Sequence, residues 1–120
     1  MNTKEVVSIY GQFEKYITEY YDNDPMGYYY ASNYYYNHTN ELAGITCRFT
    51  NDTVILFSYP RTELEENKIT VKVIVKGKQA SFKIDDLLSV LDNEGNIPVS
   101  FLEDLDLQII RTIHNLKKIK

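Results

Sequence analysis

Residues 69–84 read ITVKVIVKGKQASFKI and hold the clearest secondary-structure signal in this chain of 120 residues. Apolar and polar residues alternate on both sides of Gly77, which is the period of a half-buried β-strand. A tight turn at Gly77-Lys78 predicts a hairpin with three apolar pairs on one face, namely Val75 with Ala80, Val73 with Phe82 and Val71 with Ile84. A one-residue slip would destroy that match, so the pattern favours a single register.

A second hairpin is expected just before this one. Alternation runs from Ile45 to Phe49, and residues 53–59 are strongly β-favouring. Between them, Asn51-Asp52 has the chemistry of a tight turn. A two-residue turn there would pair Phe49 with Val54 and Cys47 with Leu56, and would place all four side chains on one face.

Helical periodicity flanks these strands. An apolar stripe of spacing three and four begins at Val6 and predicts a helix that ends near Pro25. A short helix is expected after Asp85, which can cap it. A long helix follows, since Ser100 and Glu103 have capping-box spacing and the next apolar stripe is Leu102, Leu105, Ile109, Ile113 and Leu116.

The expected fold is a single α+β domain over residues 1–120. It has an N-terminal amphipathic helix, a four-stranded antiparallel sheet made of two hairpins, and a short and a long C-terminal helix packed on one sheet face. The stretch 26–42 resists assignment. Its two tyrosine triplets suit short strands around residues 31–33, whereas Pro25 suits the first position of a helix. Irregular or short helical structure is favoured there.

Composition points to a free cytoplasmic protein. The longest apolar run is four residues, no secretion signal opens the chain, and the single Cys47 cannot form an internal disulfide. The net charge is −4, and residues 1–60 carry seven acids against three bases. Nucleic-acid binding needs clustered cations that this half does not supply, so a basic protein is the better partner.

Residue types that carry chemistry are sparse and scattered. His38, Cys47 and His114 lack metal-ligand spacing, and Cys47 falls on the expected core face. The acids at positions 85–86 and 103–106 sit where helices are expected to begin, and acids are favoured there in any case. The five glycines are isolated and cannot form a phosphate-binding loop. We therefore expect no enzyme activity, no cofactor and no metal.

Tyrosine is the one departure from ordinary composition. Nine of the eleven tyrosines fall between residues 16 and 36, and the chain has no tryptophan. Tyrosine joins a large apolar ring to a polar tip, which suits it to binding surfaces. The segment therefore predicts a partner-binding face, with packing of half of these rings on the sheet as the alternative. The predicted face consists of Asp22, Asp24, Tyr28, Tyr29, Tyr30, Tyr34, Tyr35 and Tyr36.

A secondary binding candidate follows from the hairpin register. On its outer face Lys72 would lie opposite Lys83, with Ile74 opposite Ser81 beside them. An apolar residue beside two cations could contact an acidic partner. A solvated face with one stray isoleucine is the alternative.

These features favour a small binding protein, namely an immunity protein that neutralises a bacterial toxin by occluding its active site or surface. Such a target site is often basic, which suits an acidic chain. Alternatives are a phage-encoded inhibitor of a nucleic-acid-handling host complex, and a small-ligand-binding or enzymatic domain with a tyrosine-lined pocket. Self-association through the tyrosines is a further possibility.

Overall fold

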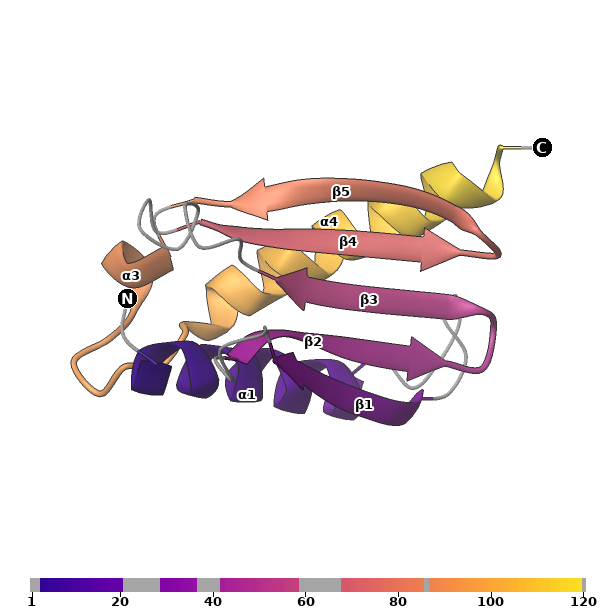
Figure 1. Cartoon of the computed structure of the whole chain (residues 1–120). Helices are drawn as coiled ribbons and strands as arrows, with labels where there is room; N and C mark the ends of the chain where they lie inside the picture. The colour runs from indigo at the N-terminus through magenta and orange to yellow at the C-terminus, as the bar shows by residue number, and fades with distance from the viewer. Residues whose placement is uncertain (1–2, 21–28, 37–41, 59–67, 86, 120) are drawn as a thin grey trace.

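The computed structural model describes residues 3–20, 29–36, 42–58, 68–85 and 87–119 of the chain (Figure 1). It is an α+β fold with one antiparallel sheet of five strands in the order β1-β2-β3-β4-β5. The elements, in chain order, are α1 (Thr3–Tyr20), β1 (Tyr29–Tyr36), β2 (Leu42–Phe49), β3 (Thr53–Ser58), β4 (Ile69–Val75), β5 (Lys78–Ile84), α3 (Leu87–Val90) and α4 (Val99–Lys117). None of the described helices is long and apolar enough to cross a membrane.

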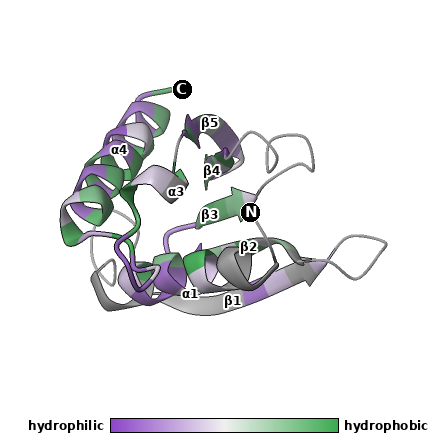
Figure 2. Ribbon diagram, turned by 90° about the vertical axis from the view of Figure 1, so that its left-hand side faces the viewer, coloured by the Kyte–Doolittle hydropathy of each residue, from purple (hydrophilic) through white to green (hydrophobic). Residues whose placement is uncertain are grey.

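Helices α1 and α4 lie on the same face of the sheet, as predicted (Figures 1 and 2). Their apolar stripes supply buried side chains on that side. The stripe predicted for α4 is confirmed, and that of α1 is confirmed at Tyr10, Phe13 and Ile17, with Ile9 as an additional buried residue. Phe13 of α1 stacks on Phe57 of β3, with ring centroids 4.7 Å apart and an interplanar angle of 12°. We call the opposite side of the sheet, which these helices leave uncovered, the outer face.

The sheet has one strand more than the sequence predicted. Residues 29–36 form the edge strand β1, which pairs antiparallel with β2, so the preference for irregular or helical structure there was wrong. Tyr29, Tyr30 and the triplet Tyr34–Tyr36 lie in one strand and do not form a hairpin. The physical reason is that β2 begins at Leu42, three residues earlier than predicted, and offers backbone partners to β1 from Tyr29 to Tyr36, with a register shift near each end.

The β2–β3 turn differs from the predicted one by one residue. Phe49 pairs with Thr53 and Cys47 with Ile55, so the loop contains three residues, the last of which is Asp52 with φ 54°. Three-residue hairpin loops typically end on a left-handed residue, which aspartate tolerates. The extra loop residue moves Val54 and Leu56 from the predicted core face to the outer face.

The β4–β5 hairpin is correct in its faces and wrong in its register. The turn is Lys76-Gly77, both with positive φ, so Val75 pairs with Lys78. The observed apolar pairs are Val73 with Ala80, Val71 with Phe82 and Ile69 with Ile84. A shift of two residues keeps each side chain on its own face, so the predicted core face survives.

A polar contact fixes α1 to the segment before α4. The side-chain amide of Gln12 donates to the Gly95 carbonyl at 3.0 Å, and its carbonyl accepts from the Ile97 N–H at 2.6 Å. Asp92 shapes this segment, because its carboxylate accepts the N–H groups of Glu94 and Asn96 at 2.8 and 2.9 Å. The Asn96 hydrogen bond, followed by that of Glu94, lowers the pKa of Asp92 below its ordinary value.

The predicted capping box at the start of α4 is not formed. Pro98 occupies the N-cap position, and Ser100 lies inside the helix. No side-chain cap is present, and the Leu102 N–H donates instead to the Pro98 carbonyl at 3.2 Å. The Gln12 contact, one residue before Pro98, therefore positions the chain where it enters α4.

We expect Gln12→Ala to lower the free energy of unfolding by about 1–3 kcal/mol, because it leaves the part-buried Ile97 N–H without its acceptor. Denaturant titration followed by circular dichroism measures this. The matched control is Gln108→Ala on the exposed side of α4, which should change stability by less than about 0.5 kcal/mol. Equal losses in the two variants would contradict a tethering role for Gln12.

Candidate functional site

Strand β1 forms one edge of the sheet and has β2 as its neighbour. An edge strand presents a row of backbone N–H and C=O groups that another chain can pair with. Two large aromatic side chains of this strand are exposed, with Tyr34 at 39% and Tyr36 at 60%. We call β1 with these two side chains the tyrosine edge.

Tyr34 links this edge to α1. It lies opposite Ile45, whose side chain is fully buried on the helix-covered side of the sheet. Its hydroxyl donates a hydrogen bond to the carboxylate of Glu14 on α1. A tyrosine held at both ends in this way loses little freedom on binding, which favours it as an anchor for a partner.

The structure places the predicted tyrosine site in part. Tyr29, Tyr30, Tyr34, Tyr35 and Tyr36 all belong to β1, whereas Asp22, Asp24 and Tyr28 lie outside the described residues. The side chains of Tyr29, Tyr30 and Tyr35 also lie outside the described part. In register, Tyr34 is opposite Ile45 and Tyr35 is opposite Gly44. The pairing with β2 has register shifts between Tyr29 and Ala31 and between Tyr35 and Tyr36, so the strand is irregular near both of its ends.

The secondary candidate, Lys72, Ile74 and Lys83, lies together on the outer face. The observed pairs are Lys72 with Ser81, Ile74 with Gln79 and Lys83 with Thr70, which corrects both predicted pairings. Because Lys72 and Lys83 are diagonal and not directly opposite, the predicted like-charge contact is relieved. Sequence reasoning missed three neighbours on this face, namely Arg48, Val54 and Leu56, because the β2–β3 register was wrong.

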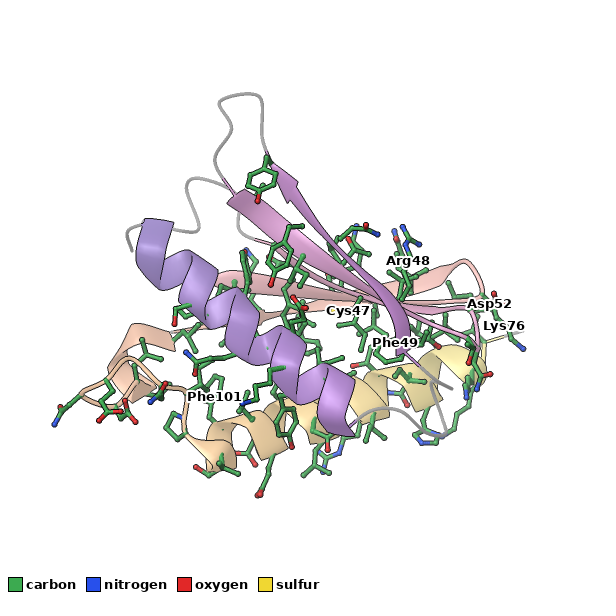
Figure 3. All side chains as sticks on the ribbon, turned by 90° about the horizontal axis from the view of Figure 1, so that it is seen from below. Cys47, Arg48, Phe49, Asp52, Lys76 and Phe101 are labelled. Carbon is green, nitrogen blue, oxygen red and sulfur yellow. The ribbon has the colours of Figure 1, made fainter. Side chains whose placement is uncertain are left out.

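Cys47 lies on the core side of the sheet and is completely buried. In Figure 3 its neighbour Arg48 projects away from the helices, whereas Phe49 lies on the same side as Cys47. A thiol in such apolar surroundings behaves as a small hydrophobic side chain. His114 is exposed in the last turn of α4, and His38 lies outside the described residues. Within the described ranges, no three His, Cys, Asp or Glu side chains are grouped to hold a metal ion.

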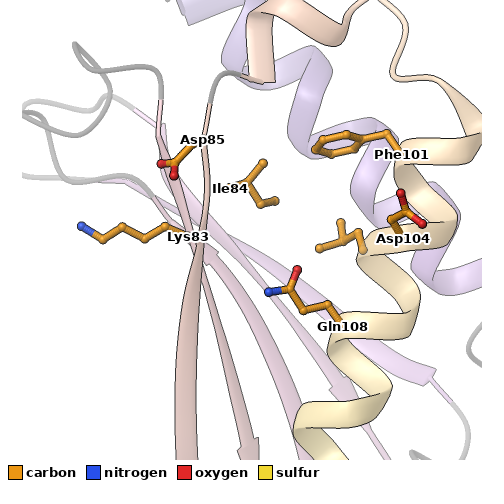
Figure 4. A pocket seen from close by; sticks show the side chains of 7 residues that line it. Lys83, Ile84, Asp85, Phe101, Asp104 and Gln108 are labelled. Carbon is orange, nitrogen blue, oxygen red and sulfur yellow. The ribbon is translucent and has the colours of Figure 1, made fainter.

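A hollow of about 230 Å³ separates the end of β5 from the start of α4 (Figure 4). Asp104 and Gln108 line it from α4, whereas Lys83 and Asp85 line it from the strand side with their side chains pointing away from α4 (Figure 4). Its remaining lining residues are Ile84, Phe101 and Leu105. Pockets for drug-sized ligands typically measure about 300–1,000 Å³. The hollow is smaller, and none of the described residues that line it is a tyrosine.

The acids near this hollow have positions that differ from those predicted. Helix α4 begins at Val99, so Glu103 and Asp104 fall after its first turn, which carries no acid. Both side chains are exposed to solvent. They therefore lie inside the helix, past the first turn, whose free backbone N–H groups most favour negative charge.

Comparison with protein-family models, curated proteins and solved structures finds no match for this chain.

Proposed function

We propose that this protein is a protein-binding inhibitor of the immunity-protein kind, which neutralises a toxin by occluding its active site or surface. The observation that carries the proposal is the tyrosine edge, where Tyr36 is 60% exposed at the border of the sheet. Interface energy concentrates in a few aromatic anchors that enter pockets of the partner. Inhibition of this kind requires contact and coverage, and no group of the inhibitor needs to react.

Two further properties support a basic target. The chain carries a net charge of −4, and all of this imbalance lies in its first half, which includes α1 and β1. Glu14 adds a carboxylate directly beside Tyr34. Opposite charge on the partner would speed the encounter, while the rings would slow dissociation. Backbone pairing with the free side of β1 offers an additional mode of contact.

The direct test uses the Tyr36→Ala variant. The partner is first captured from the lysate of the native host, identified and purified, and its activity is then titrated with this protein. We expect one-to-one inhibition by the parent chain, and an affinity lowered about 30-fold or more for Tyr36→Ala, since anchor residues contribute about 2 kcal/mol. Isothermal titration calorimetry gives the affinity, and the activity assay gives the inhibition.

The matched control is Leu107→Ala on α4, because Leu107 is a large apolar side chain that is 50% exposed on another element. It should bind like the parent chain. A captured partner whose activity is unchanged on binding would overturn the inhibitor proposal. Equal affinities for Tyr36→Ala and Leu107→Ala would remove the tyrosine edge as its basis.

A further inference from the structure

The outer face of the sheet differs in charge from the rest of the molecule. Its described positions on β2 to β5 carry the cations Arg48, Lys72 and Lys83 and no acidic residue. The chain as a whole has a net charge of −4. The three cations come from β2, β4 and β5, so positive charge extends over most of the width of the sheet.

An apolar strip crosses the centre of this face. Val54 of β3 lies opposite Ile74 of β4 on one side and Arg48 of β2 on the other. Two residues along the strand, Leu56 lies opposite Lys72. Val54, Leu56 and Ile74 are each half-buried, so their side chains keep part of their apolar surface accessible. Arg48 thus lies directly beside Val54 and Lys72 directly beside Leu56, and Lys72 is two residues from Ile74 on the same face of β4.

We propose that the outer face is a second docking surface, which binds an acidic polypeptide segment of a partner protein through apolar anchors flanked by carboxylates. The anchors would rest on Val54, Leu56 and Ile74, and the carboxylates would meet Arg48, Lys72 and Lys83. Charge complementarity selects the acidic partner, because like charge across an interface is strongly unfavourable. The surface is separate from the tyrosine edge and does not depend on the function proposed above.

The residue types favour a polypeptide over a nucleic acid. Sheets that bind single-stranded RNA or DNA stack the bases on aromatic side chains. The described residues at the centre of the outer face are aliphatic, and aliphatic groups contact leucine-like anchors better than they stack on bases. A guanidinium beside them adds a donor fork that matches a carboxylate.

The test uses a synthetic amphipathic peptide of leucine and glutamate as the probe, with isotope-labelled protein observed by nuclear magnetic resonance. We expect the peptide to shift amide signals of β2, β3 and β4, with an affinity that falls as salt is added. The triple variant Arg48→Glu, Lys72→Glu and Lys83→Glu should weaken binding at least about tenfold. Leu56→Ser should weaken it as well, through loss of the apolar anchor site.

The matched control reverses three exposed cations in α4 and at its C-cap, Arg111→Glu, Lys117→Glu and Lys118→Glu, with the same change in net charge. It should bind the peptide far better than the outer-face triple variant. Equal weakening by the two triple variants would overturn the proposal, as would tighter binding of a single-stranded oligonucleotide at the same amides. Tyr36→Ala should bind the peptide normally, which separates this result from the fate of the inhibitor proposal.

Discussion

The Ile55→Asp variant is expected to be unfolded, whereas Leu56→Asp, one residue further along β3, is expected to fold. Ile55 is completely buried on the core face, opposite Cys47 and Val73. A carboxylate there would be an unpaired charge in apolar surroundings, one of the few changes that cost more than about 4 kcal/mol. Since small domains are stable by only about 5–15 kcal/mol, most of the chain should then lose its fold.

Leu56 has the opposite environment. It is half-buried on the outer face, where it lies opposite Thr46 and Lys72. An aspartate side chain there can reach water and also meets a cation directly across the strand pair, which offsets part of the apolar area lost. We expect a loss of no more than about 1–2 kcal/mol, chiefly from reduced burial and lower β-propensity.

Circular dichroism and urea titration of the two variants measure the difference. The conservative variant Ile55→Val is the control, and it should cost about 0.5–1.5 kcal/mol and stay folded. In the register that the sequence alone favoured, with a two-residue turn, Leu56 would lie on the core face and Ile55 on the outer face. A folded Ile55→Asp with an unfolded Leu56→Asp would therefore support that register and contradict the observed one.

Side-chain periodicity was sufficient to predict most of the fold. The buried residues of α4 agree with the prediction, and those of α1 agree at Tyr10, Phe13 and Ile17, whereas Ile9 is buried in addition. The predicted pairing register of the β4–β5 hairpin was wrong by two residues, but a shift of two leaves every side chain on its predicted face of the sheet. In the β2–β3 hairpin the predicted register was wrong by one residue, which placed the side chains of β3 on the wrong faces. Hydrophobicity cannot distinguish a two-residue from a three-residue loop around Asn51-Asp52, since both Val54 and Ile55 are apolar.

Strand β1 could not be predicted for a different reason. Its sequence YYASNYYY has aromatic residues at both parities, so it shows no period of two, and residues 31–33 suggested a turn inside what is one strand. Its strand geometry depends on pairing with β2, which is a long-range interaction. The outer-face site was found in part: Lys72, Ile74 and Lys83 follow from local alternation, whereas Arg48, Val54 and Leu56 join them only once the β2–β3 register is known.

Removing the stack between Phe13 and Phe57 should produce the other large effect. Both rings are at most 1% exposed, and they join α1 to the central strand β3. Either change to alanine deletes a buried aromatic side chain and should cost about 3–5 kcal/mol. Because such losses could unfold the domain, the quantitative test uses Phe13→Leu, Phe57→Leu and their combination.

In this double-mutant cycle, urea titration of the parent chain, both single variants and the double variant isolates the contribution of the stacked pair. We expect the double variant to lose less stability than the sum of the single variants, by about 0.5–1.5 kcal/mol, because a stacked pair contributes this much beyond burial. The control cycle pairs Phe57→Leu with Phe101→Leu, since Phe101 is a half-buried ring on α4. Additive losses in both cycles would show that the two rings only fill space. Coupling in the first cycle alone would show that the contact itself holds α1 against β3. The same contact would then position the helix whose Glu14 accepts the hydrogen bond from Tyr34 of the tyrosine edge.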